Sequence, residues 1–268
     1  MRKLSPTVEA IEALRKTAPP GPVVMVNLLK FKPDGGREAY AKYLQATSPT
    51  IPAGMRILYS GKAGADVAGG EDWDFVGLAE YPSFNAFADM AASPIYQKQA
   101  IPFRPAALEK TLYMISYPAD VSEIFNPPAS SGSSRKGEMA MKKLSPTVEE
   151  IEALRKTMPP GPVVMVNLLK FKPDGGREAY FKYIQAATPA ATEGMRVVYS
   201  GKAGVDIADG EDWDFVILVE YPSFDAFADM ATGPIYQNQA IPFRPAALKK
   251  TLFMVSQSAD VSELFNPH

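Results

Sequence analysis

The chain has 268 residues, no cysteine and a single histidine, His268, and its 28 basic and 30 acidic side chains leave a formal net charge of −2. This composition excludes disulfides, thiolate metal sites and cysteine nucleophiles, and a terminal histidine is poorly placed for a triad, a haem or a zinc site. The mixed charges provide no basic field for nucleic acid, no apolar run is long enough to span a bilayer, and the N-terminus becomes charged too early for a signal peptide. We therefore predict a cytoplasmic protein that binds neither nucleic acid nor membrane and holds no metal or other cofactor.

The chain repeats itself. Residues 3–127 recur as residues 143–267, with most positions identical, and Met141 stands opposite Met1 as though a whole reading frame had been duplicated. The stretch between the copies is rich in Ser, Gly and charge, which is typical of a flexible linker. We predict a first domain at 1–127, a linker at 128–142 and a second domain at 143–268.

Each copy predicts the same elements in the same order. In the first copy, Ser5 is a candidate N-cap with Pro6 at the first position of a short amphipathic helix that ends near residue 16. Hydrophobic periodicity and turn residues then predict a strand at 21–32, a helix at 37–46, strands at 55–63 and 73–81, a helix at 84–92 capped by Ser83, and a strand at 111–117. This βαββαβ order, after one extra helix, is the ferredoxin-like arrangement, in which helices cover one face of an antiparallel sheet.

The other face of each sheet needs a cover. The first strand is apolar at nearly every position from Val23 to Leu29, as expected for a strand buried on both sides. The second copy is the natural cover in a duplicated chain. We predict an α+β fold in which two ferredoxin-like domains pair as an intrachain pseudo-dimer, and the sequence leaves further association of whole chains open.

Several strings carry a family resemblance. They are VNLLKFK, GREAY, YSGKA, WDFV, EYPSF with AFADM, and PIYQ with an Arg-containing tail, and they occur in this order in both copies. Together they resemble the domain-of-unknown-function 1330 family, a member of the dimeric α/β-barrel superfamily. The resemblance implies two ferredoxin-like units paired sheet to sheet. That superfamily also holds cofactor-free monooxygenases, muconolactone-isomerase-like enzymes, haem peroxidases and ligand-binding modules, and the lack of an internal histidine argues against the haem branch.

Asn27 and Asp74 are the first candidate catalytic residues. By strict alternation, Asn27 shares a strand face with apolar residues, where its amide either bonds to a neighbour or orients a substrate. Asp74 follows Glu71 and Asp72 and is predicted to lie inside the strand at 73–81. It is a candidate general base, although an exposed acidic turn is the simpler interpretation.

Aromatic and arginine side chains form the second group of candidates. The copy holds more tyrosine than packing needs, so a subset could line an apolar cavity for an aromatic ligand. Arg37 and Arg104 could clamp a carboxylate or enolate, or make surface ion pairs. The predicted catalytic residues are Asp74, Asn27, Tyr59, Asp214, Asn167 and Tyr199, and the predicted ligand-binding residues are Arg37, Tyr40, Trp73, Gly77, Tyr96, Arg104, Arg177, Tyr180, Trp213, Tyr236 and Arg244.

Differences between the copies suggest different roles. Gly77 becomes Ile217, and further swaps change Ala41 to Phe181, Ala79 to Val219 and Tyr113 to Phe253. Because three of these swaps add volume, one hypothesis is that the first copy keeps a roomier pocket. The alternative is that Gly77 faces Ile217 as hole to knob across a pseudo-twofold axis.

These observations lead to a function hypothesis. We expect a small-molecule enzyme without metal or haem that acts by proton transfer or oxygenation on an aromatic or enolisable substrate. In that hypothesis Asp74 or a tyrosine moves the proton, while Asn27 or an arginine holds the oxyanion. The alternatives are a binding module without catalysis, or a structural pseudo-dimer that recruits a protein partner.

Overall fold

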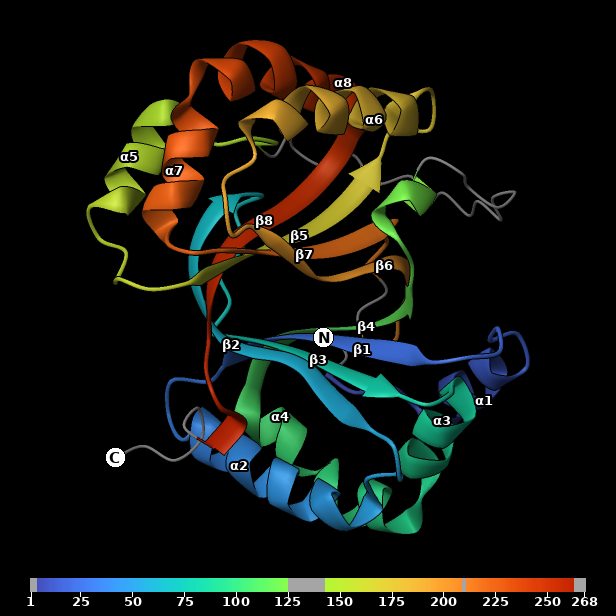
Figure 1. The fold of residues 1–268 in the computed structure, drawn as a ribbon. Helices are drawn as coiled ribbons and strands as arrows, with labels where there is room; N and C mark the ends of the chain where they lie inside the picture. Colours follow the sequence, from blue (N-terminus) through green and yellow to red (C-terminus); the bar gives the residue numbers. More distant parts are fainter. Residues whose placement is uncertain (1–3, 125–142, 209–210, 263–268) are drawn as a thin grey trace.

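Two α+β halves face each other through their sheets, and helices cover the outside of each sheet (Figure 1). The computed structural model describes residues 4–124, 143–208 and 211–262. The predicted linker at 128–142 and His268 lie outside these residues, so the domain boundaries stay predictions.

The first half follows the predicted order of elements, except that a short helix, α4 (Phe103–Ala107), precedes its last strand. Its helices and strands are α1 (Val8–Arg15), β1 (Val23–Phe31), α2 (Gly36–Thr47), β2 (Arg56–Ala68), β3 (Phe75–Tyr81), α3 (Phe84–Ala92), α4 (Phe103–Ala107) and β4 (Leu108–Pro118). A π-helical turn at Tyr96–Ala100 precedes α4, and a 3₁₀ turn at Val121–Ile124 follows β4.

The second half repeats this order. Its helices and strands are α5 (Val148–Arg155), β5 (Val163–Phe171), α6 (Gly176–Ala187), β6 (Arg196–Asp206), β7 (Phe215–Tyr221), α7 (Phe224–Thr232), α8 (Arg244–Ala247) and β8 (Leu248–Ser258). The π-helical turn recurs at Tyr236–Ala240.

Three local predictions were wrong. Thr7, not Ser5, caps α1, because its hydroxyl accepts a hydrogen bond from the Ala10 amide. Strand β2 runs past residue 63 to Ala68, because its far end pairs with β8 of the other half. Asp74 lies just before β3 and not within it.

The strands close into one antiparallel barrel. Their order is β1-β3-β2-β8-β5-β7-β6-β4, so the two halves join where β2 pairs with β8 and where β4 pairs with β6. The predicted fold, with two ferredoxin-like halves paired within one chain, is therefore confirmed.

The barrel interior is an apolar core that both halves share. Every buried residue of this core has the same residue type at the equivalent position of the other half. The pairs are Val24/Val164, Val26/Val166, Leu28/Leu168, Tyr59/Tyr199, Trp73/Trp213, Val76/Val216, Leu78/Leu218, Leu112/Leu252 and Met114/Met254. The second sheet face is thus covered by the other copy, as the apolar first strand predicts.

The chain crosses between the halves after each closing strand. Ile124, just after β4, is fully buried in the core between the second sheet and its helices, and its carbonyl accepts a hydrogen bond from Arg177 Nη1 at 3.1 Å. The segment after β8 runs toward α2 of the first half (Figure 1), where Ser60 Oγ donates to the Ala259 carbonyl at 2.5 Å. Each outer layer therefore contains residues of the opposite half.

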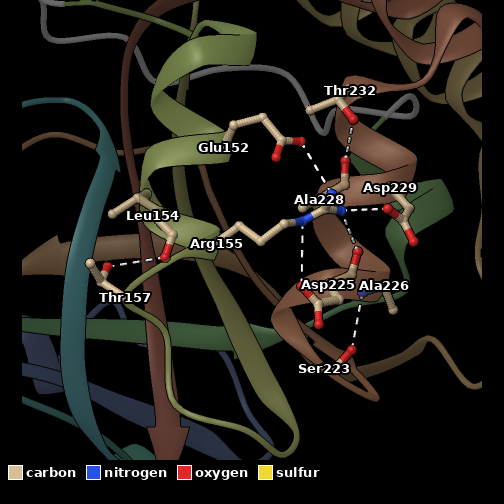
Figure 2. A network of polar contacts seen from close by, with 10 residues as sticks. All are labelled: Glu152, Leu154, Arg155, Thr157, Ser223, Asp225, Ala226, Ala228, Asp229 and Thr232. Carbon is tan, nitrogen blue, oxygen red and sulfur yellow. Dashed lines mark hydrogen bonds and ion pairs between the residues drawn. The ribbon is translucent and has the colours of Figure 1, made fainter.

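An arginine ties the two outer helices of the second half together. Arg155 on α5 reaches Asp225 and Asp229 on α7 (Figure 2), and its Nε lies 3.3 Å from Asp225 Oδ1. In the first half the equivalent ion pair joins Arg15 to Asp89 at 2.7 Å, and asparagine replaces the second carboxylate.

Candidate functional site

A cavity of about 130 Å³ lies between the outer face of the first sheet and helix α2. Its floor is a row of three neighbours across β3, β1 and β4, because Asn27 is in register with Gly77 on one side and with Tyr113 on the other. The strand alternation that places Asn27 on this face, beside Met25, is as predicted.

The side-chain amide of Asn27 makes one hydrogen bond, to the backbone of its own strand. Nδ2 donates to the Met25 carbonyl at 3.1 Å, and Oδ1 accepts no hydrogen bond within the described residues. The backbone bond fixes the amide, and the oxygen remains available to a ligand that donates a proton.

Helix α2 forms the roof of this cavity with Tyr40, Tyr43 and Thr47. The Tyr43 hydroxyl lies 2.8 Å from the Tyr96 hydroxyl, and Thr47 Oγ1 donates to the Tyr43 carbonyl at 2.8 Å. Burial raises the pKa of Tyr40, although the nearby Arg104 opposes the rise. At neutral pH this phenol is a hydrogen-bond donor and not a base.

Tyr113 on the floor is the most informative side chain. It is 4% exposed and lines the cavity, yet its hydroxyl has no hydrogen-bond partner within the described residues. Burial raises the pKa of Tyr113 well above its ordinary value, so the phenol stays protonated. The hydroxyl is not one of the fully buried unpartnered atoms among the described residues, so it is accessible from the cavity and can donate a hydrogen bond to a ligand oxygen.

Arg104 lies behind this tyrosine layer. Its side chain is fully buried, Nε donates to the Leu4 carbonyl at 2.8 Å, and the guanidinium carbon lies 5.2 Å from the Tyr43 ring centre and 5.1 Å from that of Tyr113. No carboxylate among the described residues pairs with it. Because an arginine stays charged in proteins, the cavity has a positive charge behind its polar wall.

The cavity opens through an apolar mouth. Ile51 and Ile57 both line it and are 44% and 50% exposed. Val261, which follows β8, also lines it, so the second half contributes to the first cavity.

The second half holds an equivalent cavity of about 230 Å³ under α6. Asn167 again lies on its floor and bonds to the Met165 carbonyl at 3.2 Å, while Val121 of the first half mirrors Val261. Arg244 is again buried, and its Nη2 donates to the Leu144 carbonyl at 3.0 Å.

The hypothesis of a roomier first pocket was wrong, because the second cavity is the larger one. A Cβ at Gly77 would lie 2.6 Å from Phe75 Cε1, so the Phe75 ring occupies the space that the glycine leaves. Phe75 lines the first cavity, whereas its counterpart Phe215 is fully buried and does not line the second. Smaller residues near the mouth of the second cavity, such as Ala191, offset the added volume of Ile217.

The hole-to-knob alternative was also wrong. Gly77 lines the first cavity and Ile217 the second, and the two cavities lie on opposite outer layers of the molecule.

The acidic residues that follow the Gly-rich stretch do not reach the cavity. Asp74 accepts from the Phe31 amide at 2.8 Å and from Lys30 Nζ at 3.1 Å, and Asp72 pairs with the same lysine at 2.7 Å. Lys30 thus pairs with two carboxylates. The second half repeats this arrangement with Asp214, Asp212 and Lys170.

Trp73 and Trp213 also lie apart from the cavities. Each belongs to the barrel interior, and a lysine ammonium lies over each ring, at 4.2 Å for Lys110 and 4.0 Å for Lys250. Both rings therefore form part of the joint between the halves.

Tyr59 and Tyr199 also bridge the halves. Each hydroxyl donates at 2.8 Å to a serine on the neighbouring strand of the other half, Tyr59 on β2 to Ser256 on β8 and Tyr199 on β6 to Ser116 on β4. Burial raises the pKa of both phenols. Tyr59 also touches the first cavity, but its proton is already committed to Ser256.

Arg37 and Arg177 lie over the rings of Phe31 and Phe171, and neither lines its cavity. The structure therefore brings together only part of the predicted set. The residues that share a cavity or its tyrosine layer are Asn27, Tyr40, Tyr59, Gly77, Tyr96 and Arg104 in the first half and Asn167, Tyr180, Tyr236 and Arg244 in the second.

No group of His, Cys, Asp or Glu within the described residues is arranged to hold a metal ion. None of the helices in the described parts of the chain has the length and apolarity needed to cross a membrane.

The closed barrel, with its helices outside and its cavities between helix and sheet, defines a dimeric α/β barrel contained in one chain. The profile of a family described as "Domain of unknown function (DUF1330)" matches residues 35–117. The chain is also 32% identical to a protein of unknown function from Rhodopseudomonas palustris, over 45% of this chain and 99% of that chain, with a TM-score of 0.40. The chain belongs to the DUF1330 family.

A distant likeness supports the fold alone. A mutant chlorite dismutase from Candidatus Nitrospira defluvii matches 95% of this chain and 97% of its own, with a TM-score of 0.52 and 11% identity. No curated protein matches the chain.

Proposed function

We propose that the chain binds small, ring-bearing molecules in the cavities under α2 and α6. In the first cavity, the neutral phenol of Tyr113 donates a hydrogen bond to an oxygen of the ligand. The observation that carries this proposal is Tyr113, which lines a largely apolar cavity, has no partner for its hydroxyl within the described residues, and has the Arg104 guanidinium beside its ring.

The electrostatics of the first cavity favour an oxygen with partial or full negative charge. The residues that line it include no carboxylate, lysine or arginine, so the nearby positive charge of Arg104 is not offset there. Phenols, enols and small ring carboxylates carry such an oxygen on an apolar body that suits the methionine, leucine and aromatic walls.

The experiment is a binding screen on the full chain by calorimetry with phenols, cyclic enols and ring carboxylates. We expect saturable binding that Tyr113→Phe weakens about tenfold, the value of one hydrogen bond. Ala41→Phe is a matched control, since Phe181 occupies the equivalent position on α6, is 40% exposed and does not line the second cavity. Absence of binding by every compound class would contradict the proposal.

A second candidate is catalysis, which the charge of Arg104 favours because no carboxylate within the described residues pairs with it. Tyrosine donors with a cation behind them stabilise a developing enolate or phenolate, as proton transfer or cofactor-free oxygenation requires. Since Asp74 is tied to Lys30 and Phe31, the substrate's proton would leave to water rather than to that carboxylate. Turnover that falls in Tyr113→Phe but persists in Asp74→Asn would support this candidate. Turnover that is lost in Asp74→Asn would restore the earlier hypothesis of an aspartate base.

A further inference from the structure

The two cavities differ in a patterned way. Their walls differ at several equivalent positions, whereas every buried pair of the barrel interior is identical. The differing wall pairs are Leu44/Ile184, Thr47/Ala187, Ile51/Ala191, Ile57/Val197, Gly77/Ile217, Ala79/Val219 and Tyr113/Phe253. Divergence has therefore gathered where a ligand would touch the protein.

Size is the first difference. An engineered cavity of about 150 Å³ in another protein holds benzene, so the first cavity, at about 130 Å³, matches a single six-membered ring. The second, at about 230 Å³, has room for two fused rings. It also reaches deeper, since Phe227, Met230 and Tyr236 line it, whereas their counterparts do not line the first cavity.

Polarity is the second difference. In the first cavity Tyr113, whose hydroxyl has no partner within the described residues, is in register with Asn27, and an apolar ligand that fills the cavity would leave that phenol unsatisfied. In the second cavity Phe253 stands beside Asn167, so an apolar ligand meets no unsatisfied phenol at that place.

We propose that the two halves select different ligands: the first cavity takes a single ring that carries an oxygen, and the second takes a larger, less polar two-ring molecule. The inference rests on the proposed binding function and specifies it for each half. One chain would then hold two different compounds at once.

The test uses two fluorinated probes, 4-fluorophenol and 2-fluoronaphthalene, observed by fluorine NMR with the full chain. We expect each probe to bind without displacing the other. Tyr113→Phe should weaken 4-fluorophenol about tenfold and leave 2-fluoronaphthalene unchanged.

The matched variant is Ala191→Ile, which places the first half's mouth residue, Ile51, at the equivalent position of the second cavity. It should weaken 2-fluoronaphthalene several-fold and leave 4-fluorophenol unchanged. Both variants install a residue that the other half already accommodates, so both are expected to fold, which circular dichroism checks.

The outcomes separate the two proposals. Mutual displacement of the probes, or an equal response of both probes to each variant, would overturn the different selectivity while leaving ligand binding intact. If neither probe binds the unmodified chain, the inference of different ligand selectivity is wrong. If no compound of the broader screen binds either, the proposed binding function is wrong as well.

Discussion

The two halves match closely in the barrel interior and differ in the walls of the two outer cavities. In the interior, side chains of both halves pack against one another, so a change in one half alters the surroundings of the other, and all buried pairs are identical. Each cavity is built mainly by one half, and its walls have changed in size and polarity. The difference teaches that a pseudo-dimer within one chain can keep the buried residues of its shared interior unchanged while the walls of its separate cavities differ.

The largest expected effect concerns the tyrosines around the cavities. Burial raises the pKa of Tyr40, Tyr96 and Tyr113 in the first half, and of Tyr180 and Tyr236 in the second. The unfolded chain ionises its tyrosines near pH 10 whereas the folded chain does not, so stability is complete below that pH and falls above it. Each such tyrosine contributes up to about 1.4 kcal/mol per pH unit.

Alkaline titration measures this effect through tyrosinate absorbance and circular dichroism recorded together. We expect the buried tyrosines to ionise only as the fold is lost. Tyrosinate absorbance that rises near pH 10 with an unchanged dichroism spectrum would show that these phenols are open to solvent.

Next comes the joint itself. Leu78 and Leu218 are fully buried at equivalent places in the barrel interior, so Leu78→Ala and Leu218→Ala should each lower the free energy of unfolding by about 3 kcal/mol. Denaturant titration compares the two variants. Losses that differ by more than about 1 kcal/mol would break the claim that the interior is equivalent in both halves.

A smaller effect is expected for Gly77→Ile, which gives the first cavity the residue of the second. The new side chain meets the far end of the Phe75 ring, which can rotate, so we expect a loss of about 1 kcal/mol and not the upper end of overpacking costs. A crystal structure of the variant should show Phe75 withdrawn from the cavity, as Phe215 is. A ring that stays in place would contradict our account of the volume difference.

The smallest effect concerns the surface. Asp225→Asn gives α7 the residue of the first half and removes one of the carboxylates around Arg155, and Asp225 is 73% exposed. We expect a loss of about 0.5 kcal/mol at low salt, shrinking as salt rises. Thermal unfolding at two ionic strengths measures it, and a loss that is independent of salt would point to a cause other than charge.

The fold followed from local patterns. Periodicity and turn residues predicted the order of the elements. Strand β1 is apolar on both faces, which predicted that a second sheet covers it. The length of β2 could not be predicted, because residues 63–68 become a strand only by pairing with β8 of the other half. Likewise, the cap at Thr7 depended on which hydroxyl reaches the helix.

The candidate site was only partly predictable. Strand alternation placed Asn27 on the right face, since that needs no knowledge of neighbours. The place of Tyr113 beside it depends on the register of β4 against β1, which the sequence alone does not reveal. The difference between Tyr113 and Phe253 was the one sequence signal for this position. The prediction of Asp74 as a general base did not take its lysine partner into account, because that lysine lies on another strand and the sequence does not show the contact.

Each cavity is completed by a residue of the opposite half, Val261 at the first cavity and Val121 at the second. This arrangement determines how ligand binding depends on protein concentration. Two separate chains would complete each other's cavities only while associated, so dilution would empty both sites. In a single polypeptide the partner half stays at an effective concentration on the order of millimolar, whatever the amount of protein present. The affinity of this chain for its ligands should therefore be independent of protein concentration. The cavities would stay complete even when the protein is present at a low concentration.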